Sequence, residues 1–441
     1  MSKLSETTPA TVPQATQAGS IHDRWPWVEP EVWSERMLTA LERGVKGGVW
    51  FSLIDKVYAL TTLRLAWKKV RANKGVAGID EQSIAMFEER AEMYLQQLHE
   101  QLKQGTYQPQ PVLRAWIDKA GSTEKRPLGI PAVRDRVVQS ALRLVLEPIW
   151  EARFAEQSYG FRPRRGCRDA LRRVEQLLKA GYTHVVDADL KSYFDSIPHD
   201  RLMADVRQQV ADGRVLALLE AYLHAKVMDG LQEWDPDKGT PQGAVISPLL
   251  ANLYLNEFDH TLAQAGYQVV RYADDFVILC RSREEAEQAL AQVRQYVESR
   301  GLTLHPTKTR LVDMSQKGGF DFLGYHFEGQ TRWPRRKSLD KLKDKIRSLT
   351  PRKSGRSLGE IIKKLCATLT GWYLYFRHSH YTTFAPLDGW IRMRLRSILR
   401  RRAGRKGRGR GLDHHRWPNA YFAEHGLPSL AAAHAFDCKF P

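Results

Sequence analysis

The chain has 441 residues, of which 42% are hydrophobic, and this length and composition suit two or three globular domains rather than a largely disordered polymer. It has no apolar run of membrane-spanning length and no secretion-type signal at its N-terminus, and four scattered cysteines indicate neither a disulfide framework nor a zinc site. We therefore expect a cytoplasmic protein in a reducing compartment, and its net charge of +18 favours an acidic partner.

The predicted elements begin after residues 1–20, a Ser-, Thr-, Pro- and Gln-rich tail that we expect to be disordered. Residues 25–104 have mainly helical periodicity, with a glycine-rich interruption at 73–80. Helices and strands then alternate, and a strongly amphipathic helix is expected at 283–300. The predicted strands are VVDADL (185–190), VVRYAD with FVIL (269–279) and RLVDM (310–314). This order of elements predicts an α+β layer.

The C-terminal part becomes helical and basic after GGFDFLGYHF, residues 318–327. Residues 331–416 carry 25 Lys and Arg against five Asp and Glu, whereas the rest of the chain carries 43 basic and 45 acidic groups. Aromatic side chains interleave with the basic ones, which suits packed helices beside a polyanion. This asymmetry is typical of a nucleic-acid contact, with a solvated surface or a membrane-surface patch as the alternatives.

Two adjacent carboxylates, Asp274 and Asp275, interrupt an apolar strand in RYADDFVILC. They repel each other and resist desolvation, so a fold that keeps them there must offset that cost. A partner is Asp189, at the end of another apolar strand in HVVDADLKSYFDSI, with Asp187 as an alternative. If the strands lie side by side, the three carboxylates converge. Hard divalent cations such as Mg²⁺ would then bind between them and offset their repulsion. Two such ions about 4 Å apart would stabilise the attacking and leaving oxygens of phosphoryl transfer.

Seven sequence blocks follow one another along the chain. They are KRPLGIPAVRDRVVQSAL, QSYGFRPRRGCRDAL, DADLKSYFDSIPHDRL, GTPQGAVISPLLANLYLNEFD, RYADDFVILC, LHPTKTR and GGFDFLGYHF. In content and order these blocks resemble the reverse transcriptases, most closely the maturase-type enzymes encoded within bacterial group II introns. GWYLYFRHSHYTTFAPLDGWIRMRLRSILRR then resembles the maturase, or thumb, region of that family. The resemblance extends over residues 50–402.

The resemblance implies a right-hand polymerase of the α+β class, in which the palm has an antiparallel sheet with helices and the thumb is α-helical. The expected domains are a disordered tail at 1–20, an N-terminal extension and fingers at 21–180, the palm at 181–325, the thumb or maturase domain (domain X) at 326–402, and a basic nucleic-acid-binding tail at 403–441 without an HNH endonuclease.

The activity implied by the resemblance is RNA-directed DNA polymerisation, a nucleotidyl transfer that uses two Mg²⁺ ions, for which Mn²⁺ can substitute. The implied partners are a group II intron RNA whose splicing and retromobility the protein supports, an RNA template with a DNA or RNA primer, dNTPs and target DNA. A retron or defence-system reverse transcriptase is one alternative, and the maturase-like thumb argues against it. A catalytically idle splicing cofactor is another, and the intact Asp189, Asp274, Asp275 and Gln242 argue against that.

The functional positions of the family are carried over residue by residue. The catalytic and metal-binding candidates are Asp189, Asp274 and Asp275, with Leu190 as a further metal-binding position. The nucleotide-binding candidates are Lys119, Arg126, Phe194, Gln242, Gly243 and Lys308. The nucleic-acid-binding candidates are Arg392, Arg394, Arg396, Arg400, Arg401 and Arg402.

Three of the nucleotide-binding candidates are cations. Lys119 and Arg126 flank a glycine-containing turn and would clamp the incoming triphosphate, the arginine as a fork and the lysine as a point charge. The family places a lysine at the position of Lys308 near the leaving pyrophosphate, although a solvated lysine after a strand is a common alternative.

The other candidates would contact the sugar and base. Phe194 follows Asp189 at the position where the family sets an aromatic ring against the nucleotide sugar, which disfavours a ribose 2′-hydroxyl. An ordinary core phenylalanine is an equal alternative. Gln242 and Gly243 would line the nucleotide pocket, because glycine permits close backbone approach and glutamine offers an amide.

Overall fold

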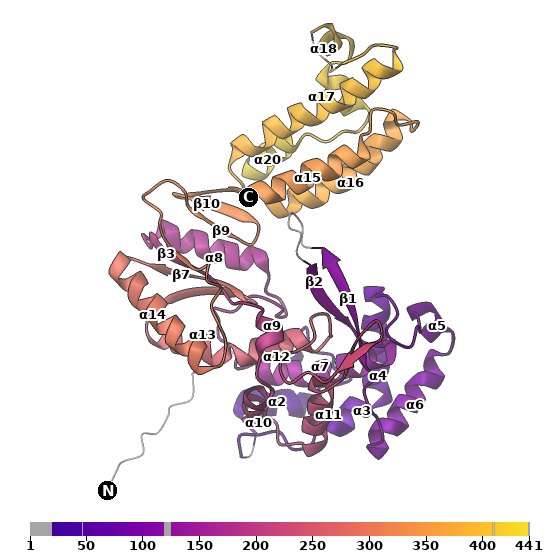
Figure 1. Cartoon of the computed structure of the whole chain (residues 1–441), viewed down its shortest axis with the longest axis vertical. Coiled ribbons are helices and arrows are strands. Elements are labelled where there is room, and N and C mark those ends of the chain that lie inside the picture. Colours follow the sequence, from indigo (N-terminus) through magenta and orange to yellow (C-terminus); the bar gives the residue numbers. More distant parts are fainter. Residues whose placement is uncertain (1–19, 46, 119–124, 408, 410, 440–441) are drawn as a thin grey trace. The chain divides into compact units, whose positions relative to one another are not determined.

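The computed structural model describes residues 20–45, 47–118, 125–407, 409 and 411–439. The chain divides into two compact units, whose elements are labelled in Figure 1. Unit 1 comprises residues 1–173, 188–278 and 284–310, and unit 2 comprises residues 174–187, 279–283 and 311–441. The division passes within α8 (Cys167–Lys179), β3 (His184–Asp189) and β7 (Asp275–Cys280).

Helices dominate the N-terminal part of unit 1, as the periodicity of residues 25–104 predicted. They are α1 (Ile21–Arg24), α2 (Glu35–Arg43), α3 (Ile54–Tyr58), α4 (Leu60–Asn73), α5 (Ile84–Glu89), α6 (Ala91–Gln104) and α7 (Val133–Glu151). Helix α7 is buried on most of its sides and packs against α3, α4 and α6 (Figure 1). A helix buried on most of its sides is typical of the centre of a core.

A first four-stranded sheet has the order β2-β1-β4-β5. Its strands are β1 (Val112–Asp118), β2 (Lys125–Ile130), β4 (Val227–Asp229) and β5 (Gln232–Trp234). The pair β1–β2 is antiparallel, with Leu113 opposite Ile130, and β4 joins β1 in parallel. These strands were not among those predicted, because charged residues and a proline interrupt their apolar residues.

A second four-stranded sheet has the order β6-β7-β3-β8, with β6 at Gln268–Tyr272 and β8 at Arg310–Asp313. Its four strands confirm the predicted ones, with ends that differ by one or two residues. The predicted amphipathic helix is confirmed as α14 (Arg283–Ser299). Between the strands lie α9 (Tyr193–Ser196), α10 (His199–Arg207), α11 (Gly213–Leu223), α12 (Ser247–Tyr254) and α13 (Asn256–Gln264). The α+β class is confirmed.

Unit 2 contains a third, antiparallel sheet with the order β11-β10-β9. Its strands are β9 (Phe320–Phe322), β10 (Tyr325–Glu328) and β11 (Thr331–Pro334). The prediction that helices begin directly after residue 327 is therefore wrong, because strand β11 comes before the first helix. The helices of unit 2 are α15 (Arg336–Leu349), α16 (Leu358–Phe376), η1 (Tyr381–Thr383), α17 (Phe384–Arg402), α18 (Leu412–Arg416), α19 (Asn419–Glu424) and α20 (Leu430–Lys439).

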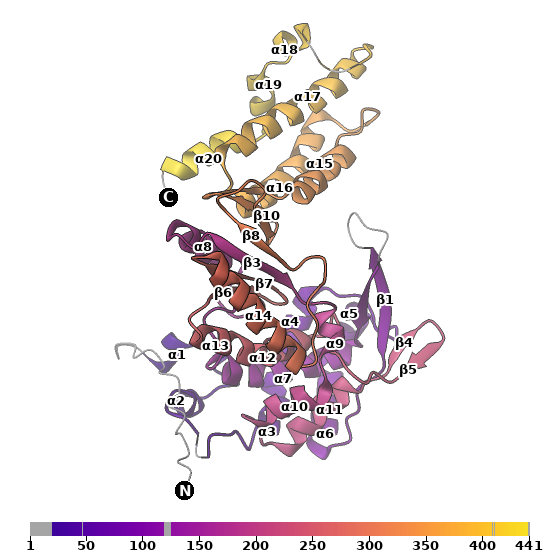
Figure 2. The ribbon, with the colours of Figure 1, turned by 60° about the vertical axis from the view of Figure 1, so that its left-hand side comes forward.

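Helices α15, α16 and α17 run alongside one another (Figure 2). Aliphatic side chains from these helices form much of the core of the helical part of unit 2. Helix α16 begins with a capping box, in which the Ser357 hydroxyl accepts the Glu360 main-chain N–H at 3.2 Å and the Ser357 N–H donates to the Glu360 carboxylate at 2.8 Å. Such a box satisfies donors that a helix start leaves unpaired, so the boundary is set by local sequence.

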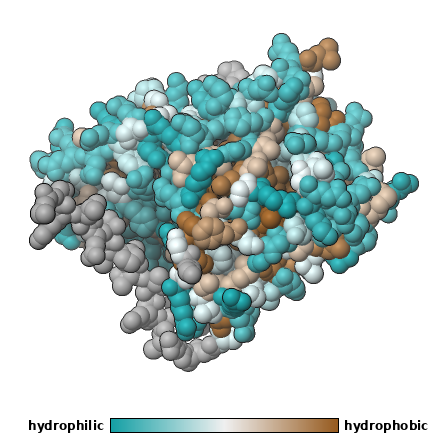
Figure 3. All heavy atoms as spheres, turned by 90° about the horizontal axis from the view of Figure 1, so that it is seen from below, coloured by the Kyte–Doolittle hydropathy of each residue, from teal (hydrophilic) through white to brown (hydrophobic). Residues whose placement is uncertain are grey.

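The surface in Figure 3 is mostly hydrophilic, with hydrophobic side chains exposed toward the middle of that face. Amphipathic helices that turn their polar sides outward produce such a surface. Within the described ranges, every helix is too short or too polar to cross a membrane.

Candidate active site

Asp274 lies in a tight turn between β6 and β7, which are neighbours in the sheet. Ala273, the other residue of the turn, has φ of 60°, a left-handed conformation that L-residues other than Asn and Asp rarely adopt. Asp275 opens β7. The pair was expected inside a buried strand, and the structure moves Asp274 to the strand end, where it is half-buried. The turn thereby reduces the cost of holding the carboxylate.

Asp189 ends β3, the strand next to β7 in the sheet. Its carbonyl accepts the main-chain N–H of His305 at 2.8 Å, and the N–H of Lys191 donates to the carbonyl of Thr303 at 2.8 Å. Leu190, whose side chain is buried, pairs with Leu304 through a β-bridge. The segment after β3 is therefore fastened to residues 303–305, which brings Lys308 to Asp189. The Lys308 ammonium forms an ion pair with the Asp189 carboxylate.

The charged groups around Asp274 shift its pKa. Burial raises the pKa of Asp274 above its ordinary value, and repulsion from Asp189 raises it further, whereas the residue's own main chain, Arg126 and Lys308 lower it. Three residues from other sequence blocks, Asp189, Arg126 and Lys308, thus lie within electrostatic reach of Asp274. Across the part of the chain that the structure describes, no three His, Cys, Asp or Glu side chains are gathered as a metal-binding group. The structure brings the predicted carboxylates Asp189 and Asp274 together.

The loop of residues 239–243 is hydrogen-bonded to the segment that carries Phe194. The N–H of Thr240 donates to the Phe194 carbonyl at 2.7 Å, and the N–H of Gly239 donates to the Ile197 carbonyl at 2.7 Å. The Gln242 amide donates to the Asp195 carboxylate at 3.2 Å. Phe194 is half-buried, and its ring makes an edge contact with the ring of Phe161 at a centroid distance of 6.5 Å. The segments that carry Phe194 and Gln242 therefore lie side by side.

Two glycines fasten β2 to the same loop. The N–H of Gly129 donates to the Gln242 carbonyl at 2.6 Å. Gly243 has φ of 110°, and a Cβ there would lie 2.5 Å from the Gly129 carbonyl oxygen. Only glycine fits such an approach, so β2 and its exposed Arg126 are held in place beside Gln242. Lys119, the second predicted triphosphate ligand, lies outside the described residues.

His199 is a buried residue of this region that the sequence analysis did not identify. Its Nε2 lies 2.7 Å from the Gly239 carbonyl, and burial lowers the pKa of the imidazole. The ring is therefore neutral at pH 7 and donates through Nε2 to that carbonyl. The sequence signal for His199 is the stretch DSIPHD (195–200), which directly follows Phe194.

Several basic residues of α17 bind the protein itself. Arg396 is 2% exposed and donates to the Trp417 carbonyl at 2.9 Å and the Asn419 side chain at 2.8 Å. Arg394 donates to the hydroxyl and carbonyl of Thr350 at 2.8 and 3.0 Å. These contacts give Arg394 and Arg396 a role in holding unit 2 together.

The remaining predicted arginines lie nearer the surface. Arg400 pairs with the buried Asp413 at 2.5 Å, and Arg402 donates to the Arg356 carbonyl. Arg392 is half-buried and Arg401 is exposed. The nucleic-acid contact predicted for the helix stays a prediction, and Arg392 and Arg401 are the residues best placed for it.

Known protein families match most of the chain. A model of the reverse transcriptase (RNA-dependent DNA polymerase) family matches residues 117–327, and a model of the group II intron maturase-specific domain matches residues 339–417. Protein YkfC of Escherichia coli (strain K12) is 37% identical over 287 residues, which cover 56% of this chain and 74% of YkfC. The group II intron-encoded protein LtrA of Lactococcus lactis subsp. cremoris is 37% identical over 203 residues, which cover 45% of this chain and 33% of LtrA.

A solved structure titled as a partial Cas6-RT-Cas1–Cas2 complex contains a similar chain, with a TM-score of 0.37 and 25% identity over 56% of this chain and 41% of that one. The two matching family models follow each other along the chain in the order that the sequence blocks predicted.

Proposed function

The chain belongs to the reverse transcriptases that carry a group II intron maturase-specific domain, and we propose from this that it copies RNA into DNA and supports the splicing of a group II intron RNA. In this proposal the fingers, palm and thumb correspond to residues 21–180, 181–325 and 326–402. The observation that carries the polymerase proposal is the meeting of Asp189 and Asp274 at the ends of neighbouring strands, with cations beside them.

The family implies a divalent metal ion, and the donor set suits one. Asp189 and Asp274 offer hard carboxylate oxygens, and Asp189 already attracts a cation in the form of the Lys308 ammonium. We assign the site to two Mg²⁺ ions, held by Asp189, Asp274, Asp275 and the main-chain carbonyl of Leu190, with Mn²⁺ as a substitute. When bound, such ions would activate the primer 3′-hydroxyl and neutralise the leaving pyrophosphate.

The chain's own residues would bind and orient the nucleotide. Arg126, exposed on β2 and held beside Gln242, would take the triphosphate together with Lys119. Phe194 would limit the space beside C2′ of the sugar, and Gln242 with Gly243 would line the pocket. The hydrogen bonds between residues 239–240 and 194–197 support this grouping, because they hold the sugar-side and base-side candidates together.

The helices of unit 2 would bind the intron RNA. Helix α15 turns Leu342 and Ile346 into the core and leaves Arg336, Lys337, Lys341 and Lys345 exposed. A row of exposed cations on one face suits phosphate contacts, which dominate nucleic-acid affinity. A target DNA, and an RNA template with its primer, would bind through the same attraction between phosphates and exposed cations.

The polymerase proposal is tested by primer extension on poly(rA)/oligo(dT) with dTTP and Mg²⁺. We expect the wild-type protein to extend the primer and Asp274→Asn to abolish extension while leaving RNA affinity nearly unchanged. Asp200→Asn, at an exposed aspartate of α10, is the matched control and should extend as wild type. Robust polymerisation by Asp274→Asn would refute the assignment of the metal site.

The splicing proposal needs a separate test, because holding an RNA in its active shape requires no phosphoryl transfer by the protein. We expect Asp274→Asn/Asp275→Asn to promote splicing of the cognate intron at near-physiological salt, with and without dNTPs. The measurement is the splicing rate against protein concentration. A double variant that binds the RNA normally but fails to splice it would contradict this division of tasks.

A further inference from the structure

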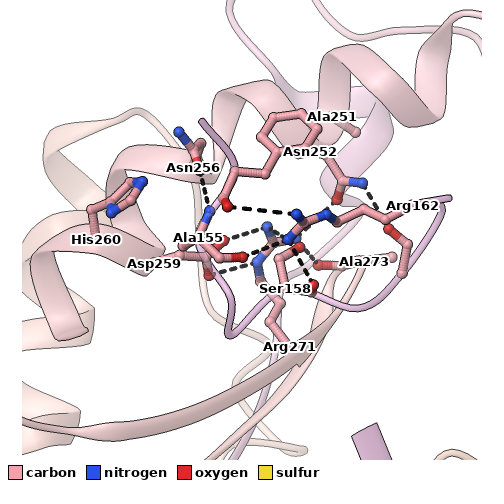
Figure 4. Close-up of polar contacts among 12 residues, drawn as sticks. Ala155, Ser158, Arg162, Ala251, Asn252, Asn256, Asp259, His260, Arg271 and Ala273 are labelled. Carbon is pink, nitrogen blue, oxygen red and sulfur yellow. Dashed lines mark hydrogen bonds and ion pairs between the residues drawn. The ribbon is translucent and has the colours of Figure 1, made fainter. Parts of the chain in front are cut away.

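Beneath the Asp274 turn, a buried ion pair joins β6 to α13. Arg271 is 1% exposed and Asp259 is 0% exposed. The guanidinium donates from Nε to Asp259 Oδ1 at 2.7 Å and from Nη2 to Asp259 Oδ2 at 2.5 Å, the two-pronged geometry in which arginine binds carboxylates most strongly (Figure 4). Such a pair is costly to desolvate unless further hydrogen bonds satisfy its remaining polar atoms.

The remaining donors of the guanidinium are satisfied as well. Nη1 donates to the Ala273 carbonyl at 2.9 Å and to the Asn252 side chain at 3.2 Å, and Nη2 donates to the Ser158 hydroxyl at 2.8 Å. A guanidinium has five N–H donors, and each one here has an acceptor. These acceptors come from α12, α13, the turn itself and the segment before α8, which Figure 4 shows converging on Arg271.

The main chain around the turn is packed equally closely. The N–H of Arg271 donates to the Gln157 carbonyl, and the N–H of Tyr159 donates to the Arg271 carbonyl, both at 2.9 Å. A Cβ on Gly160 would lie 2.5 Å from the Ala273 nitrogen, so the glycine permits the contact. The Asn252 amide donates to the Gly160 carbonyl at 2.7 Å and holds that segment in place.

We propose that Arg271, fixed by Asp259, is a positioning residue that holds the Ala273–Asp274 peptide and so aims the Asp274 carboxylate at the cation site. The Ala273 carbonyl belongs to the peptide that leads into Asp274. A charged donor on that carbonyl, together with Gly160 against the Ala273 nitrogen, holds Ala273 in its left-handed conformation. The guanidinium is paired with Asp259 and also attracts the Asp274 carboxylate, and its hydrogen bond to the Ala273 carbonyl sets the geometry of the turn.

This inference rests on the proposed function for the identity of the cation. A positioning role and a merely structural role for Arg271 predict different effects of a substitution. A structural ion pair would affect the stability of the fold and leave metal binding alone. Partners that orient a metal ligand typically change metal affinity by about 10- to 100-fold when they are removed. The conservative variant Arg271→Lys separates the two roles, because a lysine keeps a charge near Asp259 but cannot also reach Asn252, Ser158 and the Ala273 carbonyl.

The test measures Mn²⁺ binding by the loss of the free-ion EPR signal, together with the thermal midpoint and the Mg²⁺ dependence of primer extension. Asp274→Asn identifies the Mn²⁺ bound at the site. We expect Arg271→Lys to fold and to weaken that binding by about 10-fold or more. The control is Arg300→Lys, at the half-buried pair of Arg300 with Asp205 elsewhere in unit 1, which should leave Mn²⁺ binding within about twofold of wild type.

A second variant, Ser158→Ala, removes one acceptor of the guanidinium and should also weaken Mn²⁺ binding, but by less. This variant still tests the inference if Arg271→Lys does not fold. Wild-type Mn²⁺ affinity in the folded variants, with only a lower thermal midpoint, would overturn the inference. So would Mn²⁺ binding to wild type that does not depend on Asp274. If wild type binds Mn²⁺ through Asp274 but extends no primer, the proposed function fails and the positioning role stands.

Discussion

The ammonium of Lys308 lies on the carboxylate of Asp189, which precedes it by 119 residues in the chain. The hydrogen bonds between Asp189 and His305 and between Lys191 and Thr303 bring the two segments together. The lysine therefore occupies a coordination position of one of the two carboxylates that meet at the turn. A cation that binds the same oxygen, Asp189 Oδ2, must displace it.

Lys308→Ala should change metal binding and catalysis in opposite directions. Removing the competing ammonium should tighten Mn²⁺ binding several-fold. If Lys308 contacts the leaving pyrophosphate, as the family position implies, the extension rate should fall by about 10²-fold. EPR titration and single-nucleotide extension measure the two effects. Lys68→Ala, at an exposed lysine of α4, is the control, and changes in the same direction for both quantities would contradict the assignment.

Phe194→Val should raise ribonucleotide incorporation relative to deoxynucleotide incorporation by about 10-fold or more. The smaller side chain opens space beside C2′, while the hydrogen bond from Thr240 to the Phe194 carbonyl is retained because it uses the main chain. The measurement is the ratio of kcat/KM for dTTP and UTP on one primer–template. Phe51→Val, at an exposed phenylalanine, should leave the ratio as in wild type. If an active Phe194→Val protein discriminated between ribonucleotides and deoxynucleotides as wild type does, Phe194 would be an ordinary core residue.

A buried carboxylate beneath the first sheet makes stability depend on pH. Burial raises the pKa of Asp135 to about 6, although hydrogen bonds from the Tyr107 hydroxyl at 2.5 Å and the Gln110 N–H at 3.0 Å lower it. The folded pKa lies above the ordinary value of 3.8, so the folded protein holds a proton that the unfolded chain releases. This stabilisation is present in full below pH 4 and is lost as the pH rises through about 6.

Asp135→Asn should remove that part of the pH dependence. The stability difference, wild type minus variant, should be larger at pH 5 than at pH 7.5 by roughly 1 to 2 kcal/mol. Urea unfolding of both proteins at the two pH values measures it. The asparagine keeps a carbonyl and an N–H₂ for Gln110 and Tyr107, so both proteins should fold. A difference that does not vary with pH would show that Asp135 titrates with an ordinary pKa.

Arg392 and Arg396 lie four residues apart on α17 and should respond differently to substitution. Arg392→Ala should weaken RNA binding and reduce its logarithmic salt dependence by about 0.7 to 0.9 if one phosphate contact is lost. Arg396→Ala should instead lower the thermal midpoint by several degrees, because it leaves the Trp417 carbonyl and the Asn419 side chain without their donor. RNA affinity against salt and thermal unfolding of both variants measure the difference. Equal effects of the two on RNA binding would contradict it.

Several features of the protein were determined by the sequence alone. The strand that ends at Asp189, the two strands that flank the Asp274 turn, the amphipathic helix α14 and the basic helical C-terminal part are local patterns of hydrophobicity and charge, and such patterns persist in the fold. The ordered blocks also indicated the family correctly. Local periodicity and block order need no knowledge of which segments touch.

The tertiary structure decided which of these residues act together. Only contacts between distant segments place Lys308 on Asp189, set Gly129 against Gly243 and put Asp259 of α13 beneath the Asp274 turn. The same holds for Arg394 and Arg396, which look like phosphate ligands in a basic helix and which the fold places against Thr350, Trp417 and Asn419. A charge in the sequence has no partner until the chain folds, because burial and proximity, which set its energy, are properties of the packed structure.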